Sequence, residues 1–362
     1  MRILLNCTFA SLLLALPGCE EPGNSQPQSF SQPAPAAASA PAPVSAEGFR
    51  AWLPELRSRA LAAGVRQGTI DLVFPTLEFS ARTVQLDRAQ PGGTSGSTAT
   101  PPFAPYRAQH VTPALIAGGQ RRYTALLPRL QEIGRRYGVS PSVIVAIWGH
   151  ETSYGAVTGD FDLLNSLATL AYEGRRRELF AGEFVATLKM LERGVSRSQL
   201  KGSWAGATGY PQFLPSVYLR LAVDGDGDGD ADIWRSQADA LASIAHYFQK
   251  AGWKPGVPWG VAVNVPAQFD RSGFNSRLTS PRCPRVHQRH SRWMTIGEWR
   301  RLGIVAQSGV WPQDNELASL IEPDGPGRTA YLLTTNYRTI LDYNCSNFYA
   351  LSVGLLADAI AR

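Results

Sequence analysis

The fold is decided by residues 143–155, which read Val143-Ile144-Val145-Ala146-Ile147-Trp148-Gly149-His150-Glu151-Thr152-Ser153-Tyr154-Gly155. The first six are apolar on every face of a helix, which predicts a buried helix. Ser140 and Pro141 are typical of an N-cap and a first helical residue, so we expect the helix to begin there. The stretch therefore predicts a central, buried helix in a mostly helical protein.

An acidic residue, Glu151, closes this nearly all-apolar helix. Burying a charge without partners costs several kcal/mol, and desolvation raises the pKa of a carboxyl group. A carboxyl group with a raised pKa suits a general acid at neutral pH. The alternative is a helix-end glutamate whose side chain simply reaches solvent.

Other catalytic patterns are incomplete in this sequence. His150-Glu151 opens the zinc-protease pattern H-E-x-x-H, but Tyr154 stands where the second histidine is required. The chain has no G-x-S-x-G motif and no glycine-rich phosphate loop with a lysine, so serine hydrolases and nucleotide enzymes lack their motifs. Cys283, His287 and His290 lack a fourth ligand that would complete a zinc site.

Helical patterns continue on both sides of the buried helix. They cover residues 49–73 and 113–137 and return over 351–361, whereas a loop rich in Gly, Ser, Thr and Pro is expected over 90–102. Val261, Val263 and Val265 alternate as in a strand, within a stretch interrupted by Pro and Gly. With 44% hydrophobic residues, nine Trp and 14 Phe among its 362 residues, the chain has ample apolar surface to bury.

The net charge of +6 arises from 35 basic and 29 acidic residues that are mixed along the chain. This balance is compatible with an anionic partner such as a cell-wall polymer. No basic arm is present, and nothing in the sequence argues for a nucleic-acid partner.

The N-terminus predicts export. Arg2 precedes an uncharged, mostly apolar stretch over residues 3–16, which is too short to span a bilayer of roughly 30 Å and is typical of a cleaved signal. The ending Leu16-Pro17-Gly18-Cys19 resembles a bacterial lipoprotein signal, in which Cys19 is lipidated and becomes the first mature residue. The alternative is an ordinary secretory signal with a chance cysteine. Because Glu20 and not Asp follows the cysteine, lipoprotein sorting favours a periplasmic protein anchored to the outer membrane.

Two cysteines remain for the folded part of the protein. Cys7 leaves with the signal and Cys19 takes the lipid, so Cys283 and Cys345 are left as a pair in an oxidising compartment, which suggests a disulfide. Residues 20–48 are rich in Pro, Ala, Ser and Gln, with six prolines, and cannot build a core. We therefore expect a semi-extended tether over 19–48.

A second informative stretch reads Gly202-Ser203-Trp204-Ala205-Gly206-Ala207-Thr208-Gly209-Tyr210-Pro211-Gln212-Phe213-Leu214-Pro215-Ser216. Small residues let the backbone approach a ligand closely, and aromatic rings offer faces against which sugars pack. Together with Glu-Thr-Ser-Tyr-Gly after a buried helix, this stretch resembles the membrane-bound lytic murein transglycosylase B family. The resemblance covers the chain from about Phe49 to the C-terminus.

The resemblance implies a mainly α (α+β) protein with a lysozyme-like helical catalytic core, an EF-hand-like loop and a small mixed β-containing region. It implies cleavage of the bond between N-acetylmuramic acid and N-acetylglucosamine in peptidoglycan, with a 1,6-anhydro end as product and no cofactor required for the chemistry. The alternatives are a hydrolytic muramidase and a non-catalytic, calcium-bound lipoprotein that binds the cell wall.

The regions expected are a signal peptide (1–18), the tether (19–48), an N-terminal helical region (49–140), the catalytic core (141–254), the mixed region (255–335) and a C-terminal segment that completes the core (336–362).

Carried over residue by residue, the resemblance assigns the role of sole acid/base to Glu151. The residues expected to contact or flank the glycan are Ser203, Gln212, Phe213, Arg175, Arg176, Tyr247, Tyr343, Asn344 and Tyr349. Arg177 stays a candidate beside the two arginines, because the match across this triplet slips by one. For Tyr247 an ordinary packed aromatic is the alternative.

An acidic run, Asp224-Gly225-Asp226-Gly227-Asp228-Gly229-Asp230-Ala231-Asp232, matches the start of an EF-hand loop. Carboxylates stand at loop positions 1, 3 and 5 and glycine at position 6, as calcium binding requires. Position 12 is Arg235, where an EF-hand has a bidentate glutamate. The expected ligands of a structural calcium ion are Asp224, Asp226, Asp228, the backbone carbonyl of Asp230 and, from the resemblance, Asp239. The alternative is a solvated acidic turn without bound metal.

Overall fold

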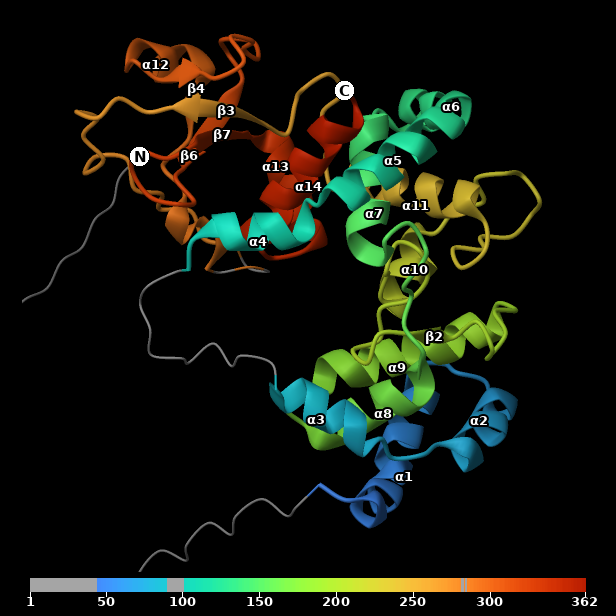
Figure 1. Ribbon diagram of the computed structural model, residues 1–362. Coiled ribbons are helices and arrows are strands. Elements are labelled where there is room, and N and C mark those ends of the chain that lie inside the picture. Colours follow the sequence, from blue (N-terminus) through green and yellow to red (C-terminus); the bar gives the residue numbers. More distant parts are fainter. Residues whose placement is uncertain (1–43, 90–100, 281–282, 284) are drawn as a thin grey trace, which may run out of the picture. The chain divides into compact units, whose positions relative to one another are not determined.

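The computed structural model describes residues 44–89, 101–280, 283 and 285–362 (Figure 1). The expected signal peptide, the lipidation site Cys19 and most of the expected tether lie outside the described residues, as does most of the loop expected over 90–102. Among the described helices, none combines the length and the apolar character needed to cross a membrane.

The described chain starts with a helical layer that precedes the buried helix. Its elements are α1 (Ala46–Ala62), α2 (Gln67–Val73), the 3₁₀ turn η1 (Phe74–Thr76), α3 (Ala81–Ala89), α4 (Phe103–His110), α5 (Pro113–Ala125) and α6 (Leu127–Tyr137). The side chain of Ser45 caps α1, so helix begins before the 48/49 boundary expected from composition. The helical pattern over 113–137 is divided between α5 and α6, because Pro128 in the first turn of α6 has no N–H to continue α5.

The apolar segment forms α7 (Pro141–Thr152), which begins at the predicted N-cap Ser140 with Pro141 in its first turn. All residues from Ser142 to Gly149 are buried. Helices α5, α11 (Gln237–Lys250) and α14 (Asn347–Ile360) pack around α7 (Figure 1). The continuous apolar run is thus explained by neighbours on several sides of one helix.

A second group of helices is built on the hairpin of α8 (Leu163–Glu173) and α9 (Arg177–Glu192). Helices α1, α2 and α3 pack against this hairpin, and α10 (Pro215–Leu221) packs against α9. The short strands β1 (Phe161–Asp162) and β2 (Lys201–Gly202) pair antiparallel, with β1 leading directly into α8.

The mixed region contains a five-stranded antiparallel sheet with the order β4-β6-β7-β3-β5. Its elements are β3 (Gly260–Asn264), the turn η2 (Val286–Arg289), β4 (Met294–Thr295), α12 (Ile296–Arg301), β5 (Val305–Ala306), β6 (Leu317–Ile321) and β7 (Ala330–Thr334). Val261 and Val263 lie in β3 as predicted, whereas Val265 follows the end of the strand. A small separate core forms where α12 covers the sheet, with Trp299 fully buried.

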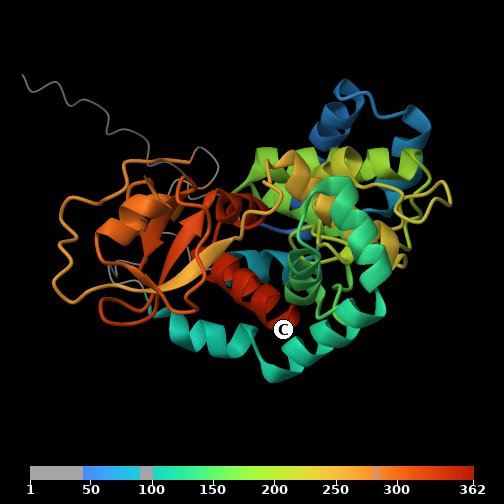
Figure 2. The same cartoon turned by 90° about the horizontal axis from the view of Figure 1, so that it is seen from above.

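Two helices return the chain from the sheet to the central helix. Helix α13 (Thr335–Tyr343) follows β7, and α14 lies between the sheet and α7 (Figure 2). Gly354 of α14 permits this packing, because a Cβ there would lie 2.4 Å from the Trp259 ring. Helix α14 begins at Asn347, earlier than the pattern over 351–361 indicates, because Ser346 accepts from the Tyr349 N–H as its N-cap.

A disulfide joins Cys283, in the mixed region, to Cys345, between α13 and α14. The Cα atoms of the two cysteines are 5.5 Å apart, within the ordinary range for a disulfide. The bond therefore ties the segment between β3 and β4 to the turn that leads into α14.

Candidate active site

Glu151 lies in the last turn of α7 and is half-buried. Desolvation of its carboxyl group raises the pKa of Glu151 to about 7. A carboxyl group with this pKa is protonated in a substantial fraction of molecules at neutral pH, so it can donate a proton and take one back. The glutamate predicted from the end of an apolar helix therefore does not behave as a solvated helix-end residue.

The Tyr349 hydroxyl donates a hydrogen bond of 2.5 Å to Oε1 of Glu151. Tyr349 is buried in the first turn of α14, and its pKa is raised well above the ordinary value by burial and by the Glu151 charge. The phenol therefore stays protonated and remains a donor. The bond favours the carboxylate and partly opposes the effect of burial on the Glu151 pKa.

The backbone directly after Glu151 adopts an uncommon conformation. Ser153 and Tyr154 have positive φ angles of 49° and 63°, a backbone conformation that residues other than glycine rarely adopt. This turn folds the Tyr154 ring under Gly149, where a Cβ would lie 2.5 Å from the ring, and the Tyr154 hydroxyl donates to the Leu115 carbonyl at 2.7 Å. Strained backbone held by such packing is common at functional sites.

Three expected glycan-contacting aromatic residues lie in mutual contact. The Tyr343 ring is 4.7 Å from Tyr247 and 6.1 Å from Phe213, centre to centre. Tyr343 and Tyr247 donate to the backbone carbonyls of Pro211 (2.5 Å) and Asp342 (2.7 Å). The Glu151 charge contributes to the raised pKa of Tyr343, which places this cluster in the electrostatic field of Glu151. Phe213 and Tyr247 are buried, so both also serve as core residues.

The loop of residues 202–213 is held in a defined shape by its polar side chains. Ser203 accepts from the Ala207 N–H at 3.0 Å. Gln212 has a positive φ of 49°, and its amide donates to the carbonyls of Gly209 (2.9 Å) and Thr158 (3.2 Å). Both side chains remain half-buried. Asn344, by contrast, is exposed at the end of α13.

The paired arginines hold a buried carboxylate. Arg175 and Arg176 both bind Asp87 of α3, with the nearest nitrogen–oxygen distance 2.6 Å in each pair. Asp87 has no exposed surface. Arg177 instead lies over the Trp52 ring and donates to the Tyr172 carbonyl. The structure thus gives Arg175 and Arg176 a partner that the sequence pattern did not reveal.

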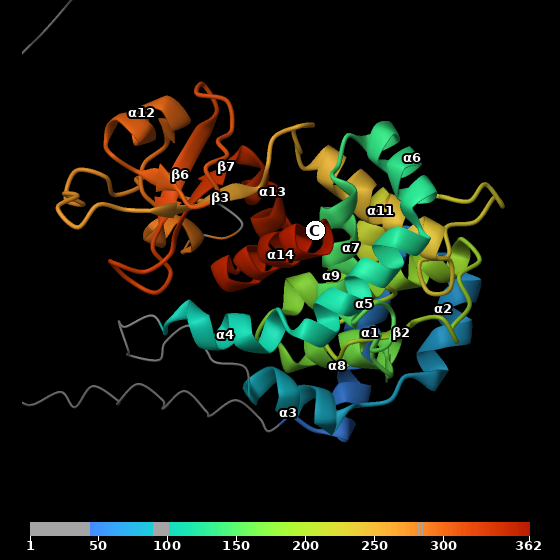
Figure 3. The same cartoon turned by 45° about the horizontal axis from the view of Figure 1, so that its top comes forward.

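Tyr106, His110 and His150 form a stack of rings beside Glu151 that was not predicted from the sequence. Tyr106 of α4 has its pKa raised by burial and by the Glu151 charge. Its ring stacks on His110, and His110 stacks on His150. No local pattern distinguishes Tyr106 or His110, because they approach Glu151 only when α4 packs on α14 (Figure 3).

Within the described residues, one group of acidic side chains lies close enough together to share a metal ion. It comprises Asp224, Asp226 and Asp239, with one carboxylate oxygen from each lying within 4.8 Å of the others. Asp239 is buried, and burial together with the charges of Asp224 and Asp226 raises its pKa. Carboxylate oxygens are the type of ligand that calcium takes. Asp228 and Asp230 are exposed and lie outside the group.

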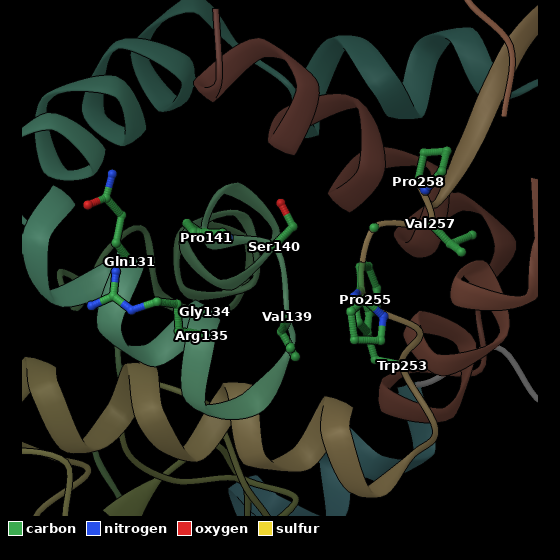
Figure 4. Close-up of a pocket in the computed structure, with 12 residues that line it drawn as sticks. Gln131, Gly134, Arg135, Val139, Ser140, Pro141, Trp253, Pro255, Val257 and Pro258 are labelled. Atoms are coloured by element: carbon green, nitrogen blue, oxygen red, sulfur yellow. The ribbon is translucent and has the colours of Figure 1, made fainter. Parts of the chain in front are cut away.

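A separate cavity of about 610 Å³ lies at the N-terminal end of α7 (Figure 4). Pro141, Val139, Trp253 and Pro255 are among its lining residues. Glu151 stands ten residues along the helix from Pro141, roughly 15 Å at 1.5 Å per residue. None of the residues predicted from the sequence to bind glycan or metal lines this cavity.

A mostly helical fold with one desolvated glutamate at the end of a buried helix places the protein in the lysozyme-like class. The model of the family described as "Transglycosylase SLT domain" matches residues 48–358, and the chain belongs to this family.

Named relatives agree with this membership. The chain is 32% identical over 326 residues to membrane-bound lytic murein transglycosylase B of Escherichia coli K12, covering 88% of this chain and 80% of the relative. Its structure is similar to that of SltB3 from Pseudomonas aeruginosa in complex with NAG-anhNAM-pentapeptide (TM-score 0.76, 39% identity, 86% of this chain and 79% of that chain). It is also similar to the Escherichia coli lytic transglycosylase Slt35 in complex with calcium (TM-score 0.68, 28% identity, 87% and 93%).

Proposed function

We propose that Glu151 is the only acid/base of this peptidoglycan lytic transglycosylase. The observation that carries the proposal is the raised pKa of the Glu151 carboxyl group, about 7, in a chain of this family. Most glycosidases need two carboxyl groups. One carboxyl group that can both give and take a proton is sufficient when the substrate supplies its own nucleophile.

The reaction proceeds in two proton transfers. Protonated Glu151 gives its proton to the oxygen that links C1 of N-acetylmuramic acid to N-acetylglucosamine, and that C–O bond breaks. The acetamido oxygen of the same sugar stabilises the developing cation at C1. The Glu151 carboxylate then takes the proton of the C6 hydroxyl as the C6 oxygen bonds to C1. The product carries a 1,6-anhydro ring, Glu151 is protonated again, and no water is consumed.

The residues around Glu151 have separate roles in this proposal. Tyr349 donates to the carboxylate after the first proton transfer and so stabilises the charged form. Ser203, Gln212 and Asn344 offer hydrogen bonds to the glycan, and the rings of Phe213, Tyr247 and Tyr343 support the sugar-binding surface. Arg175 and Arg176, which are half-exposed beside Asp87, add positive charge that favours an anionic polymer.

The decisive experiment is mass spectrometry of the products released from purified murein by the wild-type protein and by Glu151→Gln. We expect anhydro ends from the wild type and a loss of rate of roughly 10²–10⁴-fold in the variant, as for a lost general acid. Glu132→Gln, on the exposed surface of α6, is the matched control and should keep the rate. Reducing ends one water heavier would identify a muramidase, and murein binding without released fragments would identify a non-catalytic wall-binding protein.

We further propose that Cys19 carries lipid and anchors the protein in the outer membrane through the tether that follows it. The lipoprotein-like ending of residues 16–19 supports this proposal, as does the description of the Escherichia coli relative as membrane-bound. Metabolic labelling with a radioactive fatty acid should mark the wild type and leave Cys19→Ser unlabelled. Equal labelling of both proteins would contradict the anchor.

A structural calcium ion at Asp224, Asp226 and Asp239 is the third part of the proposal. Three converging carboxylates repel one another without a cation, and the calcium complex of the Slt35 neighbour supports this choice of metal. The two proton transfers at Glu151 need no metal, so the ion would stabilise the loop between α10 and α11.

A further inference from the structure

A stack of rings runs from α4 to the general acid. The His110 ring lies 3.7 Å from Tyr106 and 5.6 Å from His150, centre to centre, with interplanar angles of 9° and 13°. The His150 ring then meets the Tyr349 ring at 4.6 Å and an angle of 64°. Tyr349 in turn donates to Glu151. Rings from three helices, α4, α7 and α14, thus contact one another beside one carboxyl group. Figure 3 shows how these helices are arranged.

The two histidines differ in their hydrogen bonding. His110 Nδ1 is 2.8 Å from the Tyr106 carbonyl, one turn earlier in α4, which fixes its ring. His150 Nε2 is buried and has no hydrogen-bond partner among the described residues. A charged imidazole has two N–H donors, and the one on Nε2 would find no acceptor among the described residues, which disfavours the charged form of His150.

The surroundings also disfavour a charge on His150. Burial, and secondly the charge of His110, lower the pKa of His150 to about 4. The other titratable or charged groups on elements packed against α7 include Tyr106 of α4, Arg122 of α5, His246 of α11 and Tyr349 of α14. Arg122 lies over the rings of Trp148 and Tyr154, and Arg135 of α6 lines the cavity at the opposite end of α7. Of all these side chains, His110 alone shifts the pKa of His150 through its charge.

We propose that His150, stacked on His110, is a positioning residue of the general acid: the uncharged ring holds the Tyr349 hydroxyl on Glu151, and protonation of His150 loosens that contact and slows the reaction. This inference rests on the proposed function of Glu151 and adds to it an acid-side limit set by a residue that does not touch the reacting atoms. A charged His150 would be a cation with a buried Nε2 facing a second imidazole. Protonation is therefore expected to disrupt the contact between His110 and His150.

The physical consequence is a rate profile with two independent limbs. On the alkaline side the rate falls as Glu151 loses its proton, near its pKa of about 7. On the acid side it falls as His150 gains one, near its pKa of about 4. Because the pKa of His150 is lowered from 6.5 to about 4 in the folded protein, the unfolded chain binds the proton more readily between these values. Folding stability therefore decreases as the pH falls from about 6.5 to about 4.

The test uses the full-length protein and measures kcat, KM and folding across both limbs. His150→Phe keeps a ring against Tyr349 and removes the titration, so it should keep the plateau rate within about threefold and lose the acid limb. His150→Ala removes the support from Tyr349, so kcat should fall by about 10- to 100-fold with little change in KM, as for a misplaced catalytic group. His246 is a half-buried histidine whose Nδ1 is hydrogen-bonded to the Leu221 carbonyl. The variant His246→Phe is therefore the matched control and should keep both limbs of the rate profile.

A second readout does not depend on activity. The chain has five histidines, and loss of one imidazole signal in His150→Phe assigns that residue in a nuclear magnetic resonance titration. The His150 ring should titrate near pH 4. Burial lowers the pKa of His290 to about 4 as well, so the signal missing in His150→Phe tells the two histidines apart, and circular dichroism at each pH separates titration from unfolding. An acid limb in His150→Phe identical to the wild type, an unchanged kcat in a folded His150→Ala, or an ordinary His150 titration would overturn the inference.

The same experiment separates this inference from the proposed function. If Glu151→Gln keeps its rate at every pH, the assignment of the general acid fails. If Glu151→Gln is inactive while His150→Phe follows the wild-type profile, the acid/base assignment stands and only the role of His150 fails.

Discussion

The Tyr349 hydroxyl binds Glu151 Oε1 at 2.5 Å, across 198 residues of sequence. Two opposed effects meet at this contact. Burial favours the neutral carboxylic acid, and the donated hydrogen bond favours the carboxylate. Burial is the larger effect, so the Glu151 pKa is raised to about 7. The hydrogen bond keeps the pKa from rising further, and a glutamate that must give and then regain a proton benefits from both.

Tyr349→Phe tests this balance. The variant keeps the ring and removes the donor, so the Glu151 pKa should rise further and the alkaline limb of the rate profile should move to higher pH. The plateau rate should fall by roughly 10- to 100-fold, because a hydrogen bond to a charged group contributes about 1.5–3 kcal/mol. The control is Tyr123→Phe on α5. An unchanged alkaline limb in Tyr349→Phe would show that the bond does not influence the carboxyl group.

Glu151→Gln should stabilise the fold at alkaline pH. The folded-state pKa of about 7 exceeds the ordinary 4.5, so the folded protein binds more protons between these values. Protonated Glu151 contributes to the stability of the folded wild type. This contribution is fully present below pH 4.5 and is lost as the pH rises through about 7. The variant should therefore gain about 2–3 kcal/mol over wild type between about pH 5 and pH 8. Urea unfolding at both pH values measures the gain, and an equal difference at both would refute a raised pKa.

Asp87→Asn tests the carboxylate between Arg175 and Arg176. Asp87 is fully buried while both arginines are half-exposed, so the guanidinium groups can hydrate in the variant. We expect a loss of about 3 kcal/mol in unfolding free energy, the lower end for a broken buried ion pair. Asp71→Asn, whose exposed pair with Arg57 has the same chemistry, should lose no more than about 1 kcal/mol. Equal losses in the two variants would contradict a structural role for Asp87.

Calcium should raise the melting temperature without being needed for the chemistry. A ligand bound only by the folded state stabilises it by about 2.7 kcal/mol at a hundredfold excess over its Kd. Asp239→Asn should abolish the response, whereas Asp314→Asn, an exposed acid paired with Arg300, should keep it. Melting is compared with calcium and with chelator, and activity is assayed well below both transitions. A metal-independent melting temperature would contradict the site, and lost activity with an intact fold would assign the metal to catalysis.

Removal of the Cys283–Cys345 bond should lower the free energy of unfolding by about 4 kcal/mol, the chain-entropy value for a loop of this length. The bond closes 62 residues of sequence. The double variant Cys283→Ser/Cys345→Ser is compared with the oxidised wild type by denaturant unfolding. Equal stability, or free thiols in protein isolated without reductant, would contradict a stabilising disulfide.

Features that depend on local chemistry follow directly from the residues. The apolar run over 143–148 can only be buried, so the central helix and its start at Ser140 follow from the residues alone. The position of Glu151 at the end of that run made it a candidate general acid, but a side chain reaching solvent was the alternative, and the resemblance to the family assigned the role. The alternation at Val261 and Val263 indicated a strand, because successive side chains on a strand face two different environments.

Which distant residues meet at Glu151 depends on how the helices pack. Tyr106, His110 and Tyr349 come from α4 and α14, and no spacing in the sequence connects these helices to α7. The partner of Arg175 and Arg176, the buried Asp87, was hidden for the same reason, as was the convergence of Asp239 with Asp224 and Asp226. Periodicity reports which face of an element is apolar. The pKa of a carboxyl group depends instead on which side chains and how little water surround it, and these are set when the helices pack.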